Sequence, residues 1–333
     1  MAFRFGLLGA GRIGQVHARA VAATPGTRLV AVADALAAAA GSVAAEHGAE
    51  VRGVDAIIAA GDIDAVLICT PTDTHADLIE AAARAGKAIF CEKPISLDLA
   101  RARACLGVVR ETGARLMLGF QRRYDPHFRA VKSAIDEGRI GVVEMIQITS
   151  RDPGAPPVSY IERSGGIFRD MTIHDFDKAR WMLGEDPVTV YATGSVLTDP
   201  AIAAAGDFDS ASVVLTTASG KQCCISNSRR AGYGYDQRIE VHGSKGMVCA
   251  ENQRPVSIEV ATADGFTRPP LHDFFMTRYT AAYAAEIAAF VQAVASGSPP
   301  SPSGEDGLAA LALADAAHRS AREGRVIHLE SLV

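Results

Sequence analysis

The stretch FRFGLLGAGRIGQVHA, residues 3–18, decides how this chain folds. It begins with a short apolar run typical of a buried strand, continues with Gly9, Gly11 and Gly14 at the spacing G-x-G-x-x-G, and ends in a segment of helical composition. In such a strand–turn–helix unit the first glycine permits a tight turn, the second lets a pyrophosphate approach the backbone, and the third allows the helix to pack closely on the strand. The stretch therefore predicts a dinucleotide-binding unit; the alternative is a tight turn that holds no ligand.

The alternation of strand and helix continues to about residue 120. Further apolar runs, bounded by Gly, Pro, Thr or Asp, lie at 28–34, 65–70, 88–93 and 115–120. Alanine-rich segments of helical composition separate them. Because strands that alternate with helices form parallel sheets with helices on both faces, we expect residues 1–122 to fold as a doubly wound Rossmann domain.

After residue 124 several strand-like segments follow one another without helices between them. They lie at 142–150, 188–197, 210–220, 222–230, 237–250 and 255–262. Helices are predicted at 167–183, 280–297 and 304–324. The chain is therefore expected to be of the α/β class, with the N-terminal parallel sheet followed by an α+β domain, 123–333, on a large open sheet of mixed or antiparallel strands.

The composition excludes several classes of protein. The 333 residues are 48% hydrophobic and 21% charged, which is the balance of an ordinary globular chain and not of a disordered one. A formal net charge of −5 at pH 7 offers no positive field for nucleic acid or anionic lipid. No apolar stretch is long enough to span a bilayer. We therefore expect neither nucleic-acid nor membrane partners.

The six cysteines show no C-x-x-C pair and no Cys/His spacing suited to zinc. We therefore expect no metal site, and we interpret the cysteines as small buried apolar side chains in a reducing compartment. This interpretation places the protein in the cytoplasm.

Asp34 ends the second predicted strand, at the distance beyond Gly14 where dinucleotide-binding units carry an acidic residue. A carboxylate there accepts hydrogen bonds from both ribose hydroxyls of NAD and repels the 2′-phosphate of NADP. No arginine follows in residues 35–37 to bind such a phosphate. The N–H groups of Arg12 and Ile13, at the helix N-terminus, are expected to bind the phosphates. The sequence therefore predicts NAD as the cofactor; an exposed Asp at a strand end is the alternative.

Two further loops follow strands at the carboxyl edge of the predicted sheet, where open α/β folds bind ligands. The first carries Thr70, Pro71, Thr74 and His75. We expect these residues to line the nicotinamide side of the cofactor. A simple turn, with Thr74 or Asp73 as the cap of the following helix, is equally consistent with the pattern.

The second loop is Cys91-Glu92-Lys93-Pro94. Its position at the strand end places Glu92 and Lys93 among the residues expected beside the cofactor. Pro94 restricts the geometry of Lys93, which indicates a positioned cation. A surface lysine in a turn is the alternative.

The predicted helix 167–183 carries Asp170, His174, Asp177 and Trp181. At 100° per residue these side chains lie within about 60° of one another and form a polar stripe that must face water or a cleft. Asp170 and His174 are close enough for the carboxylate to orient the imidazole, or for both to bind one substrate hydroxyl. The alternative is an acidic helix N-terminus followed one turn later by a histidine with a structural partner.

Five segments, in the same order along the chain, resemble the Gfo/Idh/MocA oxidoreductase family. They are GLLGAGRIGQVHA (6–18), CEKP (91–94), GFQRRYDP (119–126), GGIFRDMTIHDFD (165–177) and GSKG (243–246). Within this family, the segments QRRYDPHF (121–128), SRDP (150–153) and 160–184 are most similar to the members that oxidise inositol. The resemblance covers nearly the whole chain.

The resemblance implies a Rossmann domain and an α/β domain on a large open sheet, with NAD(H) and a polyol or sugar in the cleft between them. It implies that Lys93, Asp170 and His174 are the catalytic set, in contact with the substrate. It further implies substrate-side roles for Arg123, Asp152, Tyr233 and Tyr235.

The expected reaction is the NAD-dependent oxidation of a ring hydroxyl of a cyclic polyol, first of all myo-inositol to a keto-inositol. His174 is expected to be the general base, while Lys93 stabilises the alkoxide. The alternatives are a scyllo-inositol or aldose dehydrogenase of the same family, and a non-catalytic NAD(H)-binding regulatory protein. An open sheet that few helices cover also predicts a homo-oligomer, a dimer or, as the resemblance implies, a tetramer.

Overall fold

The computed structural model describes residues 2–332, which form two compact units. Unit 1 contains the chain up to Asp125 together with Thr280–Leu311. Unit 2 contains Pro126–Tyr279 together with Ala312–Leu332. The chain first passes from unit 1 to unit 2 after Asp125, close to the predicted domain boundary at 122/123. The structure differs from a continuous second domain, 123–333, because the chain returns to unit 1 after Tyr279.

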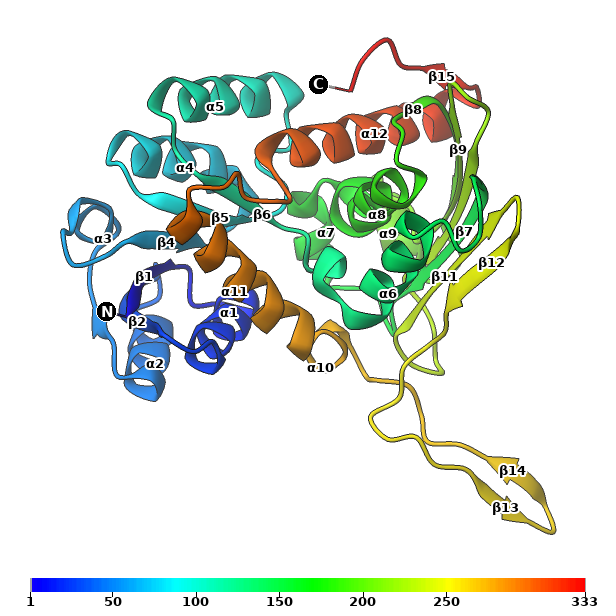
Figure 1. The fold of residues 1–333 in the computed structure, drawn as a ribbon, viewed down its shortest axis with the longest axis horizontal. Helices are drawn as coiled ribbons and strands as arrows, with labels where there is room; N and C mark the ends of the chain where they lie inside the picture. Colours follow the sequence, from blue (N-terminus) through cyan, green and yellow to red (C-terminus); the bar gives the residue numbers. More distant parts are fainter. Residues whose placement is uncertain (1, 333) are drawn as a thin grey trace. The chain divides into compact units, whose positions relative to one another are not determined.

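Unit 1 contains a parallel sheet of six strands in the order β3-β2-β1-β4-β5-β6 (Figure 1). The strands are β1 (Phe3–Leu8), β2 (Thr27–Ala33), β3 (Glu50–Val51), β4 (Ala65–Ile68), β5 (Ala88–Glu92) and β6 (Leu116–Gly119). All neighbouring strands run parallel, which confirms the predicted doubly wound sheet. The exposed two-residue strand β3 has no apolar run that could predict it.

The helices of unit 1 connect these strands. They are α1 (Arg12–Ala23), α2 (Ala37–His47), α3 (Val54–Ala59), α4 (His75–Arg84), α5 (Leu99–Thr112) and α11 (Thr280–Ser296), with the 3₁₀ turns η1 (Thr72–Thr74) and η2 (Gln121–Tyr124). Figure 1 shows α11 beside α1. Helix α11 belongs to unit 1 because its aromatic rings complete the core there. The Phe290 ring centroid lies 6.1 Å from that of Phe5 and 5.8 Å from that of Phe90.

Unit 2 contains a mixed sheet of seven strands in the order β12-β11-β7-β10-β9-β8-β15. The strands are β7 (Val143–Arg151), β8 (Pro187–Ser195), β9 (Ser210–Thr217), β10 (Gln222–Ser228), β11 (Asp236–Gly243), β12 (Gly246–Ala250) and β15 (Ile327–His328). Only the pair β7–β10 is parallel among the strand pairs of this sheet in the described chain. The predicted α+β domain on a large mixed sheet is confirmed.

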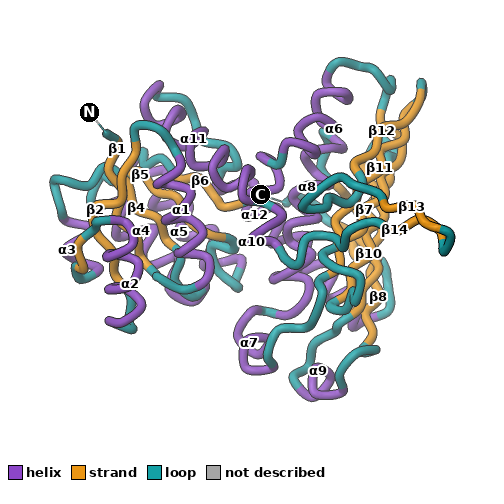
Figure 2. The backbone as a smooth tube through the Cα atoms, turned by 90° about the horizontal axis from the view of Figure 1, so that it is seen from below, coloured by secondary structure: helices purple, strands orange, loops and turns teal. Residues whose placement is uncertain are grey.

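The helices of unit 2 lie on one face of its sheet. They are α6 (Pro126–Asp136), α7 (Val158–Ser164), α8 (Ile173–Leu183), α9 (Pro200–Ala204), α10 (Phe275–Arg278) and the part of α12 (Gly304–Glu323) from Ala312 onward. Figure 2 shows α6 and α8 on the same side of the strands. Alternate residues point to the other face, where Met145, Tyr191 and Val214 are 52%, 41% and 38% exposed.

Two of the predicted strands differ in the structure. Residues 237–250 form a hairpin of β11 and β12 instead of one strand, with Gly243 paired to Gly246. Of residues 255–262 only β13 (Val260–Thr262) is a strand, and it pairs with β14 (Gly265–Thr267) in a separate two-stranded sheet (Figure 1). Its three residues are exposed, so burial does not hold this segment against the large sheet.

The cysteines are free thiols, but they are not uniformly buried. Cys224 is half-buried and Cys249 is exposed, while the other four are buried. The predicted burial is therefore wrong for Cys249, which lies on the edge strand β12. Burial raises the pKa of Cys105 to about 12, which keeps that thiol protonated at neutral pH. Within residues 2–332, no helix combines the length and apolar character needed to cross a membrane.

Candidate active site

The turn between β1 and α1 has the geometry that its three glycines predict. Gly9 adopts a φ of 97°, and a Cβ there would lie 2.6 Å from the carbonyl carbon of Cys69. A Cβ on Gly14 would lie 2.0 Å from the Gly9 carbonyl oxygen, so only glycine lets α1 pack this close to the turn. A Cβ on Gly11 would meet nothing within 4 Å, which leaves the backbone open at this position.

The N-terminus of α1 lies directly beside this open backbone. Gly11 is the N-cap residue, Arg12 is the first residue of the helix, and no side chain of the described chain caps this end. The first N–H groups of a helix have no partner within the helix, and together with the helix dipole they attract anions. An uncapped helix end next to open backbone fits the pyrophosphate of NAD.

Asp34 is held against the glycine turn. Its Oδ2 accepts a hydrogen bond from the Ala10 N–H at 2.6 Å, and its Oδ1 accepts one from the Leu36 N–H at 2.8 Å. Each carboxylate oxygen has a second lone pair, so the half-buried side chain can still accept the ribose hydroxyls expected of it. The two backbone bonds orient the carboxylate before any ligand arrives.

The loop after β4 is joined to the CEKP segment by His75. This histidine is 1% exposed; its Nδ1 lies 2.8 Å from the Pro94 carbonyl oxygen and its Nε2 lies 2.8 Å from the Thr70 carbonyl oxygen. Burial lowers the pKa of His75, against the opposite influence of the two carbonyls. Both ring nitrogens therefore meet backbone, which differs from the cofactor contact expected of this side chain.

The hydroxyl of Thr74 also turns back into its own loop. It donates to Thr70 Oγ1 at 2.6 Å and to the Pro71 carbonyl at 2.8 Å. Thr74 is the N-cap residue of α4, but its side chain makes no capping hydrogen bond. The predicted capping role of Thr74 is therefore wrong, because the hydroxyl closes the turn instead.

Glu92 and Lys93 end β5 in different environments. Glu92 is 8% exposed, and its Oε1 lies 2.6 Å from His17 Nε2 of helix α1. This position in the core differs from the cofactor side expected of Glu92. Lys93, the next residue, is half-buried, and the Lys93–Pro94 peptide bond is cis.

Arg123 has an acidic partner inside unit 1. Its Nη2 donates to Asp306 Oδ1 at 2.9 Å, and 12% of its side chain is exposed. Asp306 also accepts a hydrogen bond from the Ser303 N–H at 2.9 Å at the start of α12. The ion pair therefore gives Arg123 a structural role, and its contact with substrate stays a prediction.

In unit 2, Asp170 and His174 lie on one continuous helical stretch. Asp170 belongs to a π-helical turn, η3 (Phe168–Thr172), and His174 is the second residue of α8. Both side chains are half-buried. Asp177 is only 1% exposed, so the predicted four-residue polar stripe is wrong. Asp177 and His174 both lie in the α-helix α8, so the packing of that helix buries Asp177, while the π-helical turn changes only the angle between Asp170 and these residues.

Asp170 is positioned by two side chains that were not among the predicted site residues. The Tyr160 hydroxyl donates to Asp170 Oδ1 at 2.9 Å, and Arg229 Nη2 lies 3.6 Å from Asp170 Oδ2. Arg229 is 1% exposed and also lies 3.4 Å from Asp207 Oδ2. A buried guanidinium needs such partners, so it holds the two carboxylates in place. The signal in the sequence that points to Arg229 is the pair of adjacent arginines in NSRR (227–230).

A buried polar network fixes the first turn of α8 against the sheet. Asp175 Oδ1 accepts a hydrogen bond from Ser150 at 2.7 Å, and its Oδ2 accepts one from Asn227 Nδ2 at 2.9 Å. Lys178 Nζ lies 3.2 Å from the same carboxylate. The Thr172 hydroxyl donates to Asn227 Oδ1 at 2.7 Å. The network ties both sides of His174 to β7 and β10, and buried hydrogen bonds of this kind rigidify the segment that they hold.

Asp152 and Tyr233 lie near the strand ends that carry Arg229. The N–H of Asp152 donates to the Ser228 carbonyl at 2.9 Å, which joins the ends of the parallel strands β7 and β10. Arg151 Nη1 donates to the Tyr233 hydroxyl at 3.1 Å. The structure therefore brings two of the predicted substrate residues to the sheet edge where Arg229 holds Asp170.

The two tyrosines have different environments. Tyr233 is 50% exposed, and its hydroxyl donates to Asp236 Oδ2 at 2.5 Å; desolvation and this bond raise its pKa. Tyr235 is 5% exposed, with its ring centroid 5.5 Å from that of Phe274 and 6.0 Å from that of Tyr279. Tyr235 therefore packs in the core, and its contact with substrate stays a prediction.

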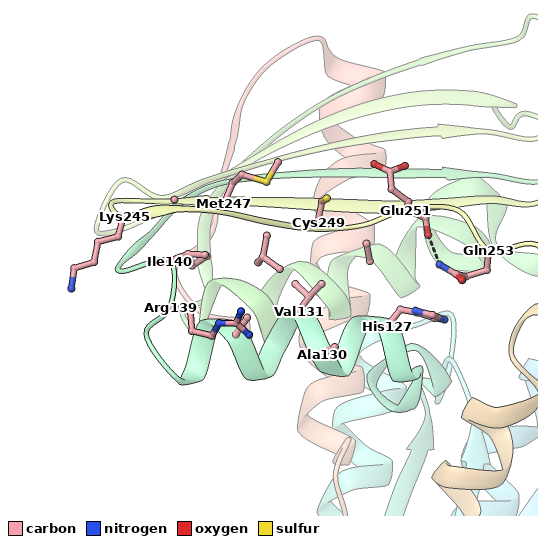
Figure 3. Close-up of a pocket in the computed structure, with 14 residues that line it drawn as sticks. His127, Ala130, Val131, Arg139, Ile140, Lys245, Met247, Cys249, Glu251 and Gln253 are labelled. Carbon is pink, nitrogen blue, oxygen red and sulfur yellow. Dashed lines mark hydrogen bonds between the residues drawn. The ribbon is translucent and has the colours of Figure 1, made fainter. Parts of the chain in front are cut away.

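A cavity of about 670 Å³ lies between α6 and β12 in unit 2 (Figure 3). Val131 and Arg139 line it from the side of α6, and Met247 and Cys249 line it from β12. The cavity does not include the predicted site residues, so we do not identify it with the active site.

Comparisons with known proteins agree with this geometry. Residues 3–120 match the oxidoreductase family with an NAD-binding Rossmann fold, and residues 128–249 match the GFO/IDH/MocA C-terminal domain. An inositol 2-dehydrogenase of Rhizobium meliloti (strain 1021) is 72% identical over 329 residues, 99% of this chain and 100% of the relative.

Solved structures show the same fold. A myo-inositol dehydrogenase from Corynebacterium glutamicum ATCC 13032 is 44% identical with a TM-score of 0.96, over 99% of this chain and 100% of that chain. A scyllo-inositol dehydrogenase from Lactobacillus casei, with NAD(H) and scyllo-inositol bound, is 30% identical with a TM-score of 0.92, over 99% and 100%. Two matched domains, full-length relatives and a glycine turn that fits NAD agree: this chain belongs to the Gfo/Idh/MocA family of oxidoreductases, and its cofactor is NAD.

Proposed function

We propose that this protein oxidises one ring hydroxyl of an inositol, with myo-inositol as the substrate and a keto-inositol as the product. The observation that carries the proposal is the 72% identity, across 99% of the chain, to a protein named inositol 2-dehydrogenase. The first alternative substrate is scyllo-inositol, which the similar Lactobacillus casei structure contains together with NAD(H). NAD, when bound, accepts the hydride from the carbon that carries the hydroxyl.

In this proposal three side chains act on the substrate. His174 accepts the proton of the reacting hydroxyl, and Lys93 donates a hydrogen bond to the same oxygen so that its developing negative charge is stabilised. Asp170 orients His174 or accepts a neighbouring hydroxyl. The bonds from Tyr160 and Arg229 support this role, because they hold the Asp170 carboxylate in one place.

The remaining predicted residues are assigned by their environments. Asp152 and Tyr233, at the same sheet edge as Arg229, are proposed to bind the other hydroxyls of the substrate. Arg123 and Tyr235 are proposed substrate residues of second rank, because each already has partners within its own unit. Gly9, Gly11, Arg12, Ile13, Gly14 and Asp34 are proposed to bind NAD, with Thr70, Pro71 and Thr74 on the nicotinamide side.

A panel of substrates tests the proposed reaction. We expect kcat/KM with NAD to be highest for myo-inositol, followed by scyllo-inositol, then D-glucose and L-glucose, with lactate last. Each polar group of the site left without a hydroxyl partner costs about 1–3 kcal/mol, so a simple hydroxy acid is a poor substrate. Lactate in first place would refute the polyol assignment, and an aldose in first place would refute the inositol assignment alone. NADH binding without turnover of any compound would favour the regulatory alternative.

The cofactor preference depends on Asp34. We expect the wild-type kcat/KM to be higher with NAD than with NADP. Asp34→Ala should reduce the ratio of the two kcat/KM values, NAD over NADP, roughly tenfold, because the variant loses both the hydrogen bonds to the ribose and the repulsion of a 2′-phosphate. Asp34→Asn is the matched control, since it keeps an acceptor but removes the charge. Steady-state kinetics with both cofactors measures the ratio. A wild-type preference for NADP would refute the assignment.

The open face of the unit 2 sheet is proposed to pack against a second copy of this chain. Met145, Tyr191 and Val214 are large exposed apolar side chains on that face, and such side chains on an otherwise polar surface mark an interaction site. We expect light scattering at micromolar concentration to report a dimer or tetramer of the 34.9 kDa chain. Val214→Lys and Tyr191→Lys together should shift it to monomer. A monomeric wild type would refute the proposal.

A further inference from the structure

The two residues that flank Lys93 are each held by a buried histidine. His17 Nε2 lies 2.6 Å from the Glu92 carboxylate, on the N-terminal side of Lys93. His75 Nδ1 lies 2.8 Å from the Pro94 carbonyl oxygen, on its C-terminal side. His17 and His75 are 0% and 1% exposed, whereas Lys93 is half-buried. The histidines therefore cannot meet a substrate, but they contact both neighbours of the lysine.

The His17 ring is itself packed between two aromatic rings. Its ring centroid lies 4.9 Å from that of Phe90 and 5.4 Å from that of Tyr283, both at steep interplanar angles. The Glu92 side chain that it contacts also packs closely on β6, because a Cβ on Gly119 would lie 2.9 Å from Glu92 Oε1. The end of β5 is therefore held between helix α1 and strand β6, one residue before Lys93.

His75 holds the other side through a different route. It is the first residue of α4, and its Nε2 contacts the carbonyl of Thr70, in the loop after β4. A neutral imidazole has only one N–H, and holding Pro94 requires it on Nδ1, so Nε2 only lies beside the Thr70 carbonyl and the ring stands between two neighbouring loops at the carboxyl edge of the sheet. Pro94 cannot be held through an N–H of its own, so its carbonyl is the group through which this side of the segment is fixed.

We propose that His17 and His75 are positioning residues that together set the location of the Lys93 ammonium. The inference rests on the proposed role of Lys93 in stabilising the reacting oxygen. A lysine amine sits on a flexible four-carbon stem, so its position is defined only if the backbone at its base is held. A displacement of about 1 Å of a catalytic group costs roughly a hundredfold in rate.

Substitution by asparagine or by glutamine tests the two ring nitrogens of each histidine separately. The amide nitrogen of Asn takes the place of Nδ1, and that of Gln takes the place of Nε2. His75→Asn therefore keeps the contact with Pro94, and His75→Gln keeps the contact with Thr70 instead. At His17 the active substitution is the other one. His17→Gln keeps the contact with Glu92, whereas His17→Asn loses it.

We expect His75→Asn and His17→Gln to retain kcat within about threefold, and His75→Gln and His17→Asn to lower it roughly ten- to a hundredfold. The KM for NAD should stay unchanged in all four. Because the smaller amide is active at one position and the larger at the other, a loss of packing volume cannot produce this pattern. Equal losses of kcat in all four variants, in step with their Tm, would show a structural role only and overturn the proposal.

A double-variant cycle asks whether the histidines act through Lys93. In the Lys93→Ala background, His75→Gln and His17→Asn should cause no further loss of kcat, because there is no ammonium left to position. If they lower the residual rate by the same factor as in the wild type, the histidines act independently and the proposal is wrong. If Lys93→Ala itself keeps full activity, the proposed role of Lys93 fails instead. The two failures are therefore distinguishable.

Discussion

His174→Ala is expected to lower kcat by about two orders of magnitude or more with the fold intact. The reacting hydroxyl must lose its proton as the hydride leaves, and a positioned general base contributes roughly 10²–10⁴-fold to such a step. The structure supports this expectation. Asp175 and Thr172, on either side of His174, are hydrogen-bonded to the sheet, so the base that the substitution removes is held in a fixed position. NADH formation under saturating substrate measures the effect.

The pH dependence provides a second readout for the same residue. Only a neutral imidazole accepts a proton, so wild-type activity should rise with pH as His174 loses its proton, and His174→Ala should lose this rise. His328→Ala, at an exposed position on β15, is the matched control and should keep both rate and profile. Near-normal turnover by His174→Ala would mean that another group takes the proton.

Lys93→Ala is expected to lower kcat by a similar factor of about 10² or more. A preorganised donor to a developing oxyanion is worth roughly 10²–10³ in rate, and an ammonium supplies both the hydrogen bond and the charge. Lys93→Met, which keeps the length of the side chain, should be as inactive as Lys93→Ala. That result would assign the effect to the charge and not to volume.

Thermal unfolding and NAD binding are the controls for this variant. We expect the Tm to change little, because Lys93 is half-buried at a strand end, and the Kd for NAD shows whether the lysine also contacts the cofactor as predicted. Lys132→Ala, which removes an ion pair with Asp136 on the surface of α6, should leave kcat at the wild-type value. Full activity of Lys93→Met would show that the positive charge of Lys93 does not stabilise the reacting oxygen.

The features that were predictable from the sequence depend on residues close together in the chain. Gly9 and Gly14 meet within one turn, so their spacing alone specifies the approach of α1 to β1. Asp34 ends the strand that pairs with β1, and its bond to the Ala10 N–H follows from that pairing. Short apolar runs likewise indicated nearly every strand of the parallel sheet, because buried parallel strands are apolar throughout.

The features that were not predictable are contacts between distant residues. No local pattern pairs Arg229 with Asp170, or Glu92 with His17, because each contact depends on how separate elements pack. The same reason explains the error at Asp177. Asp177 and His174 both lie within α8 at the predicted spacing, but the packing of that helix buries Asp177, and the π-helical turn at Phe168–Thr172 shifts only Asp170 relative to them.

The sequence by itself therefore determined the fold class, the glycine turn for NAD and the family, since these are encoded in short motifs and in their order. Only the tertiary structure decided which carboxylates are buried, that α11 completes the core of unit 1 through Phe290, and that Lys93 lies between residues held by His17 and His75. The physical reason is that hydrophobic burial has no direction: a pattern shows that a side chain must be buried, but not against which partner.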